Sequence, residues 1–107
     1  MMTFTTLLPK RRNDGSAVSR TERNGILASL RSQFGGVSAE GEIEGQWVDD
    51  DGTVHRDRSL KVTVACDRER LHEAEEAVKK IGRQLGQKAM YFEIRHGDGV
   101  TFLRVDD

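Results

Sequence analysis

The sequence has 107 residues, of which 36% are hydrophobic and 33% are charged, and its formal net charge is −1 at pH 7. This length predicts one domain, residues 1–107, because two domains would each be too small to bury a useful core. The balanced charge excludes a global positive field of the kind that holds proteins nonspecifically on nucleic acid or on anionic membranes.

The N-terminal segment predicts a strand followed by a loop. Residues 2–8 mix β-branched and aromatic side chains with threonine, which favours an extended conformation. Pro9 has no amide hydrogen for a sheet ladder, so the strand ends there. Residues 10–18 are polar and contain an Asn-Asp-Gly turn signal, and we expect a flexible loop.

A helix is predicted from Ser19 to the glycine pair Gly35-Gly36. Ser19 and Glu22 have the spacing of a capping box, in which the serine oxygen accepts from an amide of the first turn and the glutamate reaches back. Glycine ends a helix readily because it adopts a positive φ without steric cost. The apolar positions at helical spacing are Ile26, Leu27, Leu30 and Phe34.

Residues 41–48 alternate: Ile43, Gly45 and Trp47 point one way, and the polar residues Glu42, Glu44 and Gln46 point the other. This pattern is typical of a strand with one solvent-exposed face. We expect Trp47 to be a core anchor and Gly45 to face inward beside it, leaving room for the ring. A contact between subunits is the alternative role for Trp47. The acidic run 49–51 with Gly52 predicts a hairpin turn in preference to a cation site, because it lacks the spacing of an EF-hand loop.

The second half of the chain predicts another strand, a helix and a closing hairpin. Residues 53–66 have β character, with Leu60, Val62, Val64 and Cys66 on alternate positions. Asp67 is a natural N-cap for a helix over 68–87, whose apolar stripe is Leu71, Ala74, Val78, Ile81 and Leu85. Strands are expected over 89–95 and 100–105, joined by a tight turn at 96–99.

This order predicts an α+β fold: a ferredoxin-like split β-α-β-β-α-β arrangement with an additional C-terminal strand. Both helices cover one face of an antiparallel sheet, and the other face is left open. The open face is expected to carry polar side chains of mixed sign, namely Thr3, Thr5, Glu42, Glu44, Gln46, Ser59, Lys61, Thr63, Tyr91, Glu93 and Arg95. Tyr91, Glu93 and Arg95 would form a shallow platform for a ligand on an otherwise solvated or dimer-forming surface.

Catalytic and metal-binding patterns are weak. The three histidines lack the i, i+4 spacing of a helical metal pair, and no phosphate-binding glycine loop is present, so we expect no metal site and no cofactor. His55 beside Asp57, or His96 beside Asp98, could serve as an acid-base pair because a carboxylate can orient an imidazole. Cys66 would be a small buried hydrophobic residue, and as the single cysteine it excludes an intramolecular disulfide and favours a reducing, cytoplasmic location.

A basic cluster in the 10–18 loop could contact phosphates. Its members are Lys10, Arg11 and Arg12, with Arg20 and Arg23 nearby. The cluster has no interleaved aromatic residues, and Tyr91 is alone where an RNA-recognition sheet would carry two or three aromatics. A solvated loop is therefore favoured over a nucleic-acid site. No apolar run approaches the roughly 20 residues of a membrane span, so no membrane association is expected.

A family resemblance is carried by "FGG" at 34–36, "GQWVDDDG" at 45–52, the β-rich segment that follows, the long charged helix and "YFEIR" at 91–95. Together they resemble a small uncharacterised ferredoxin-like α+β family of the DUF3574 pattern. The resemblance covers roughly residues 20–95 and implies the fold. It implies no activity and no functional residue.

Three functions remain open on this basis. The first is a noncatalytic module that self-associates, as a dimer, and binds a protein or a small ligand. The second is a small enzyme using His55 or His96 with a carboxylate such as Glu93, and the third is nucleic-acid binding through the basic loop. The candidate binding residues are Arg11, Arg12, Trp47, His55, Tyr91, Glu93 and Arg95.

Overall fold

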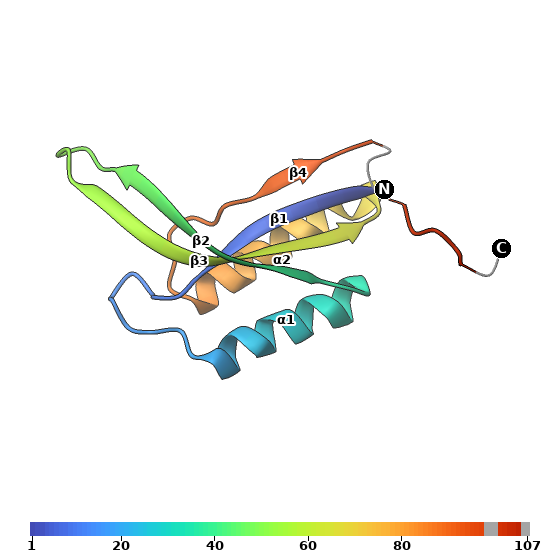
Figure 1. The fold of residues 1–107 in the computed structure, drawn as a ribbon, viewed down its shortest axis with the longest axis horizontal. Helices are drawn as coiled ribbons and strands as arrows, with labels where there is room; N and C mark the ends of the chain where they lie inside the picture. The colour runs from blue at the N-terminus through green and yellow to red at the C-terminus, as the bar shows by residue number, and fades with distance from the viewer. Residues whose placement is uncertain (98–100, 106–107) are drawn as a thin grey trace.

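A computed structural model of the chain describes residues 1–97 and 101–105. Its described part contains an antiparallel sheet and two α-helices, which confirms the α+β fold class (Figure 1). The elements are β1 (Met2–Pro9), α1 (Arg20–Phe34), β2 (Ser38–Val48), β3 (Val54–Cys66), the 3-10 turn η1 (Arg68–Arg70), α2 (Leu71–Gln84) and β4 (Glu93–Arg95). The split β-α-β-β-α-β order is therefore as predicted.

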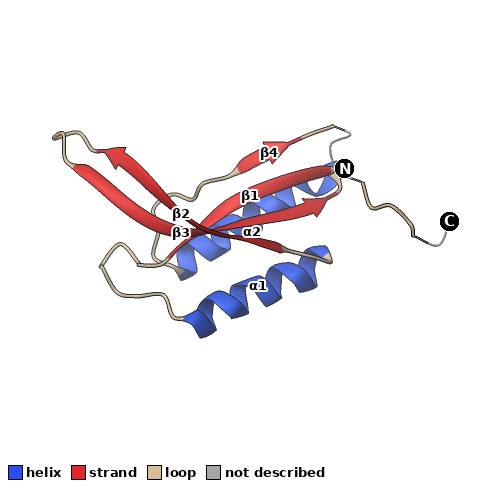
Figure 2. Cartoon of the chain, viewed as in Figure 1, coloured by secondary structure: helices blue, strands red, loops and turns tan. Residues whose placement is uncertain are grey.

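The sheet has the strand order β2-β3-β1-β4, with every neighbouring pair antiparallel. Central strand β1 is paired along its whole length with β3, from Met2 opposite Cys66 to Pro9 opposite Ser59. Both helices lie on the same side of the sheet, and the β2–β3 hairpin extends past them (Figure 2). The chain thus has one helix-covered sheet face and one open face.

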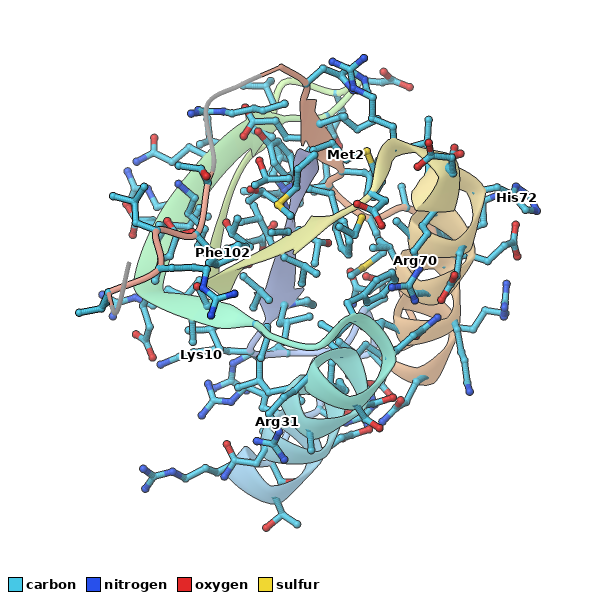
Figure 3. The ribbon with its side chains drawn as sticks, turned by 90° about the vertical axis from the view of Figure 1, so that its right-hand side faces the viewer. Met2, Lys10, Arg31, Arg70, His72 and Phe102 are labelled. Atoms are coloured by element: carbon cyan, nitrogen blue, oxygen red, sulfur yellow. The ribbon has the colours of Figure 1, made fainter. Side chains whose placement is uncertain are left out.

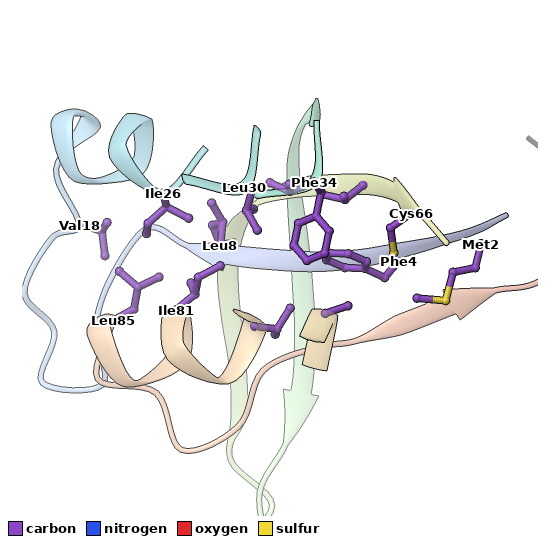
Figure 4. Close-up of a cluster of buried hydrophobic side chains, with 14 residues drawn as sticks. Met2, Phe4, Leu8, Val18, Ile26, Leu30, Phe34, Cys66, Ile81 and Leu85 are labelled. Carbon is purple, nitrogen blue, oxygen red and sulfur yellow. The ribbon is translucent and has the colours of Figure 1, made fainter. Parts of the chain in front are cut away.

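The hydrophobic core lies between the helices and the covered face (Figure 4). Phe4 on β1 is fully buried and meets the Phe34 ring edge-on, with centroids 5.4 Å apart, while Phe92 packs on its other side at 5.6 Å. Leu60, Val62, Phe92 and Ile94 belong to the same cluster as Leu71, Val78, Leu30 and Phe34, as the alternation predicts. Cys66 is buried among them, and burial raises the pKa of its thiol.

The ends of α1 follow from local sequence. Ser19 Oγ accepts a hydrogen bond from the Glu22 amide at 3.0 Å, and Gly35 ends the helix at φ 89° with its amide bonded to the Arg31 carbonyl. The capping box also predicts that the Glu22 carboxylate reaches back to the start of the helix. This part of the prediction is wrong, because the carboxylate accepts a hydrogen bond from Arg12 instead. Among the described residues, no helix is both long and apolar enough to cross a membrane.

The predicted orientation of β2 is wrong, because the strand contains a β-bulge. Ala39 pairs with Val62 but Glu42 pairs with Leu60, so β2 carries one extra residue, which Gly41 accommodates at φ 99°. The extra residue exchanges the two faces of the strand. Ile43, Gly45 and Trp47 consequently lie on the open face, while Glu42, Glu44 and Gln46 lie on the other. Trp47 is 51% exposed, so it is no core anchor.

The ends of the second helix and of the last strand also differ from the predicted ranges. The second α-helix spans Leu71–Gln84, and the Asp67 side chain makes no capping hydrogen bond. The strand expected over 89–95 is only Glu93–Arg95, and residues 101–105 form no strand, since the C-terminal segment leaves the sheet. Asp98, Gly99 and Val100, which complete the predicted turn and hairpin, lie outside the described residues.

The loop between β1 and α1 is closed by its own hydrogen bonds. Arg12 donates its amide to Ser16, and Val18 donates its amide to Lys10, both at 2.8 Å. A β-bridge joins Arg11 to Ala17. The predicted loop over 10–18 is therefore a small hairpin beside the end of the sheet, and its flexibility stays a prediction.

Candidate functional site

A groove of about 530 Å³ opens on the helix-free side of the sheet, and we refer to it as the open-face groove. Its floor consists of the ends of β1, β2 and β3, and its walls are the 10–17 hairpin and the segment that precedes β4. The lining residues are Leu7, Pro9, Arg11, Arg12, Asn13, Gly15, Trp47, His55, Asp57, Ser59, Gln87, Ala89, Met90 and Tyr91. Three separate parts of the chain thus meet at one site.

Trp47 and His55 form a stacked pair at the outer end of this groove. They are directly opposite each other across the β2–β3 ladder, with ring centroids 4.3 Å apart and planes 16° apart. Two carboxylates fix the pair: Trp47 Nε1 donates to Asp57 at 2.7 Å, and His55 Nε2 lies 2.6 Å from Asp49 Oδ2. Both rings are therefore held by a polar contact as well as by stacking.

The His55–Asp49 contact determines which ring nitrogen carries a proton. Hydrogen bonds from Asp51 and from His55 lower the pKa of Asp49 to about 2, so this carboxylate is ionised near neutral pH. A carboxylate only accepts hydrogen bonds, so Nε2 of His55 must be the donor. In the neutral imidazole the lone pair is then on Nδ1, which is the nitrogen that can take up a proton.

The two arginines of the hairpin wall are held in different ways. Arg11 donates from Nη1 to the Gly15 carbonyl, which keeps its side chain beside the hairpin. Arg12 bonds to Ala17 O and forms an ion pair of 2.5 Å with Glu22, whose pKa is lowered mainly by that contact. Arg12 is therefore largely neutralised.

The opposite wall is the segment between α2 and β4. The Thr6 hydroxyl on β1 donates to the Tyr91 carbonyl at 2.7 Å and so ties this segment to the sheet. The Tyr91 side chain remains 50% exposed. Met90 lies against Gly82 of α2 and also lines this groove, so it borders both the helix layer and the open face. The wall offers one aromatic ring and one flexible apolar side chain to a ligand.

Five of the seven predicted binding residues line the open-face groove: Arg11, Arg12, Trp47, His55 and Tyr91. Glu93 and Arg95 do not line it. They pair with Thr5 and Thr3 on β1 and form a 3.7 Å ion pair with each other. Because Thr5 pairs with Thr63, Glu93 lies eight residues along the sheet from His55, roughly 27 Å at ~3.4 Å per residue.

The predicted acid-base pairs do not form as expected. Asp57 binds Trp47 rather than His55, and the partner of His55 is Asp49, which the sequence had placed only in a turn. The pairing of Val48 with Val54 is the signal that could have found it, because it brings residues 49 and 55 to the same end of the hairpin.

The remaining histidines lie away from the groove. His72 is an exposed residue of α2 (Figure 3), and His96 is exposed after β4. The Asp98 expected beside His96 lies outside the described residues. Within residues 1–97 and 101–105, no group of three or more histidine, cysteine or acidic side chains is placed to hold a metal ion.

Comparisons with known proteins identify relatives of the fold. No protein-family model and no curated protein matches the sequence, so the resemblance to the DUF3574 pattern stays a prediction. A phage SAM lyase in complex with S-methyl-5′-thioadenosine is similar with a TM-score of 0.68 and 12% identity, over 88% of this chain and 79% of that one. The apo state of a phage SAM lyase gives a TM-score of 0.58 and 13% identity, over 88% and 78%. At this level of identity the similarity shows that the chain shares the fold of these lyases.

Proposed function

We propose that the protein is a binding module that holds a small molecule with a planar heteroaromatic ring, of the nucleoside type, in the open-face groove. The observation that carries this proposal is the convergence of the Trp47–His55 pair and Tyr91 on one groove of about 530 Å³. The volume falls within the ~300–1,000 Å³ of typical ligand sites.

The composition of the groove also favours such a ligand. Leu7, Pro9 and Met90 supply apolar surface, and Asn13, Ser59 and Gln87 are uncharged polar residues of the lining that would orient a bound ring. A solved structure of similar fold holds S-methyl-5′-thioadenosine, which is a nucleoside derivative. Fold similarity alone assigns no ligand, so the support comes from the groove and the precedent together.

Calorimetric titration with adenosine and with S-methyl-5′-thioadenosine tests the proposal. Tyr91→Ala should weaken binding about five- to 150-fold, because stacking a base on an aromatic ring contributes ~1–3 kcal/mol. Phe102→Ala is the matched control, since Phe102 is an exposed aromatic residue outside the groove. Absence of binding, or equal Kd values for the two variants, would refute the proposal.

A second candidate function is enzymatic, and the His55–Asp49 pair favours it. Asp49 holds the proton on Nε2 and so presents Nδ1 as a general base, and the neighbours of similar fold are named as SAM lyases. Consumption of SAM should be detectable by chromatography and should fall ~10²–10⁴-fold in His55→Asn. His72→Asn should have no effect, because His72 is on the exposed side of α2. Unchanged SAM levels with the native protein would remove this candidate.

Self-association as a dimer is supported by the exposed edge of β2. All eleven residues of this strand are exposed, including Ile43 and Trp47. An antiparallel pairing of two β2 strands centred on Gly45 would place Ile43 opposite the partner's Trp47, and Glu44 opposite the partner's Gln46, with no like charges facing each other.

Light scattering after size exclusion tests this interface. The native chain should elute as a dimer at high protein concentration, whereas Ile43→Lys should elute as a monomer because a lysine on an edge strand opposes edge-to-edge pairing. His72→Lys is the control, since His72 is an exposed residue of α2, outside the sheet. A monomeric native protein would refute the dimer.

A further inference from the structure

A second groove, of about 570 Å³, lies between the 10–17 hairpin, α1 and the covered side of the β2–β3 hairpin, and we refer to it as the basic groove. Five of its lining residues are cations, namely Lys10, Arg11, Arg23, Arg56 and Arg58. Two are acids, Glu44 and Asp57. The overall charge of the chain is −1, so this cationic excess is local and results from the fold.

Most of the positive charge in the basic groove is not balanced. Lys10 forms an ion pair with Glu42, and Asp57 is already bonded to Trp47. Within the described part of the chain, Arg23, Arg56 and Arg58 form no ion pair. Glu44 pairs with Arg58 across the ladder, but its carboxylate accepts from Gln46 instead. Three guanidinium groups therefore line one groove without forming an ion pair, although the charges of Arg58 and Arg23 help Lys10 to lower the pKa of Glu42.

The sheet topology brings these three arginines together. β1 ends at Pro9, opposite Ser59, and the Lys10 amide donates to the Arg58 carbonyl at 3.1 Å; the β1–β3 ladder does not continue to the outer part of β3 beyond this point. Arg56 and Arg58 are on the same face of β3 as Leu60, which puts them level with Arg23 in the first turns of α1. Like charges that line one groove repel each other, and an anion among them would be attracted to all three.

We infer that the basic groove binds the phosphate group of a phosphorylated small molecule. Guanidinium groups match phosphate oxygens in a two-pronged geometry, which makes arginine the preferred side chain for such sites. An extended nucleic acid is a poorer fit, because the same hairpin carries Glu40, Glu42 and the 49–51 aspartates along its length. The inference goes beyond the proposed function and does not depend on it, although the two grooves share Pro9, Arg11 and Asp57.

Calorimetric titration with inorganic triphosphate at low salt tests the inference. The native protein should bind the probe, and the double variant Arg56→Gln/Arg58→Gln should bind it at least about tenfold more weakly, since two charge-assisted contacts to phosphate oxygens are lost. The control Lys79→Gln/Lys80→Gln removes the same charge from an exposed part of α2 and should leave the Kd unchanged. Circular dichroism confirms that both variants fold.

Three outcomes would overturn the inference. The first is absence of triphosphate binding. The second is equal weakening in the two double variants, which would mean that only net charge matters. The third is a single-stranded oligonucleotide that binds far more tightly than triphosphate, with a steep salt dependence, which would make this surface a nucleic-acid site. Adenosine binding in the open-face groove should be unaffected by the Arg56 and Arg58 substitutions, so failure of the proposed function would be seen separately.

Discussion

Two glycines in the two helices should respond differently to the same substitution. Gly25 in α1 is exposed, and a Cβ atom added there meets no atom within 4 Å. Gly82 in α2 is buried, and a Cβ atom added there would lie 2.7 Å from Cγ of Met90 and 3.5 Å from its Sδ. We therefore predict that Gly25→Ala stabilises the protein and that Gly82→Ala does not.

The expected magnitudes follow from two effects. Replacing glycine by alanine in a helix interior stabilises by ~0.8–1.0 kcal/mol, and at Gly25 nothing opposes this gain. At Gly82 the same gain is offset by overpacking, which costs typically ~1–3 kcal/mol. Because Met90 is flexible and lies beside a groove of about 430 Å³, it can move away, so the cost should be near the lower end of that range. The two variants should differ by about 1–2 kcal/mol.

Urea denaturation followed by circular dichroism measures both free energies of unfolding. The variant Met90→Ala and the double variant Gly82→Ala/Met90→Ala complete a cycle in which the penalty at position 82 should disappear once the longer side chain is gone. Equal stabilisation by Gly25→Ala and Gly82→Ala would refute the reasoning. Because Met90 also lines the open-face groove, Gly82→Ala should in addition change ligand affinity, whereas Gly25→Ala should not.

Three further predictions concern single side chains. Ser19→Ala should lower the free energy of unfolding by about 1 kcal/mol, because the Glu22 amide loses its cap; an unchanged urea midpoint would contradict this. Hydrogen bonds from Arg70 and Gln33 lower the pKa of Glu73 from 4.5 to about 2, so its contribution to stability is present above pH 4.5 and is lost as the pH falls toward 2. The stability difference between the native protein and Glu73→Gln should therefore shrink over that range, and a constant difference would exclude the linkage. Cys66 should react with iodoacetamide only as fast as the protein unfolds, because its thiol is buried and burial raises its pKa; rapid labelling of the folded protein would contradict this.

The sequence by itself determined those features that depend only on interactions between neighbouring residues. The cap at Ser19, the stop at Gly35 and the turn at Gly52 each depend on a few neighbouring residues, and all three are present in the structure. The alternation from Leu60 to Cys66 and the stripe of α2 fixed the core, because an apolar face must be buried wherever the sheet places it. These features were sufficient for the α+β class and the order of its elements.

Alternation alone could not orient β2, because it separates two faces without showing which one is covered. Ala39 is opposite the buried Val62, so a regular strand would have turned Trp47 toward the helices, as predicted. The bulge at Gly41 reverses that choice, and its presence depends on the pairing of β2 with β3. The β2–β3 hairpin also extends past the end of β1 and past both helices, so no helix covers its tip (Figure 2).

The candidate site was visible in the sequence only as separate residues. Arg11, Trp47, His55 and Tyr91 come from the β1–α1 hairpin, two strands and the segment before β4, and nothing local brings them together. Strand order and register do so, because they place the ends of β1 and β3 beside the hairpin turn. Local chemistry therefore determined which residues could act, and long-range pairing alone decided which of them meet.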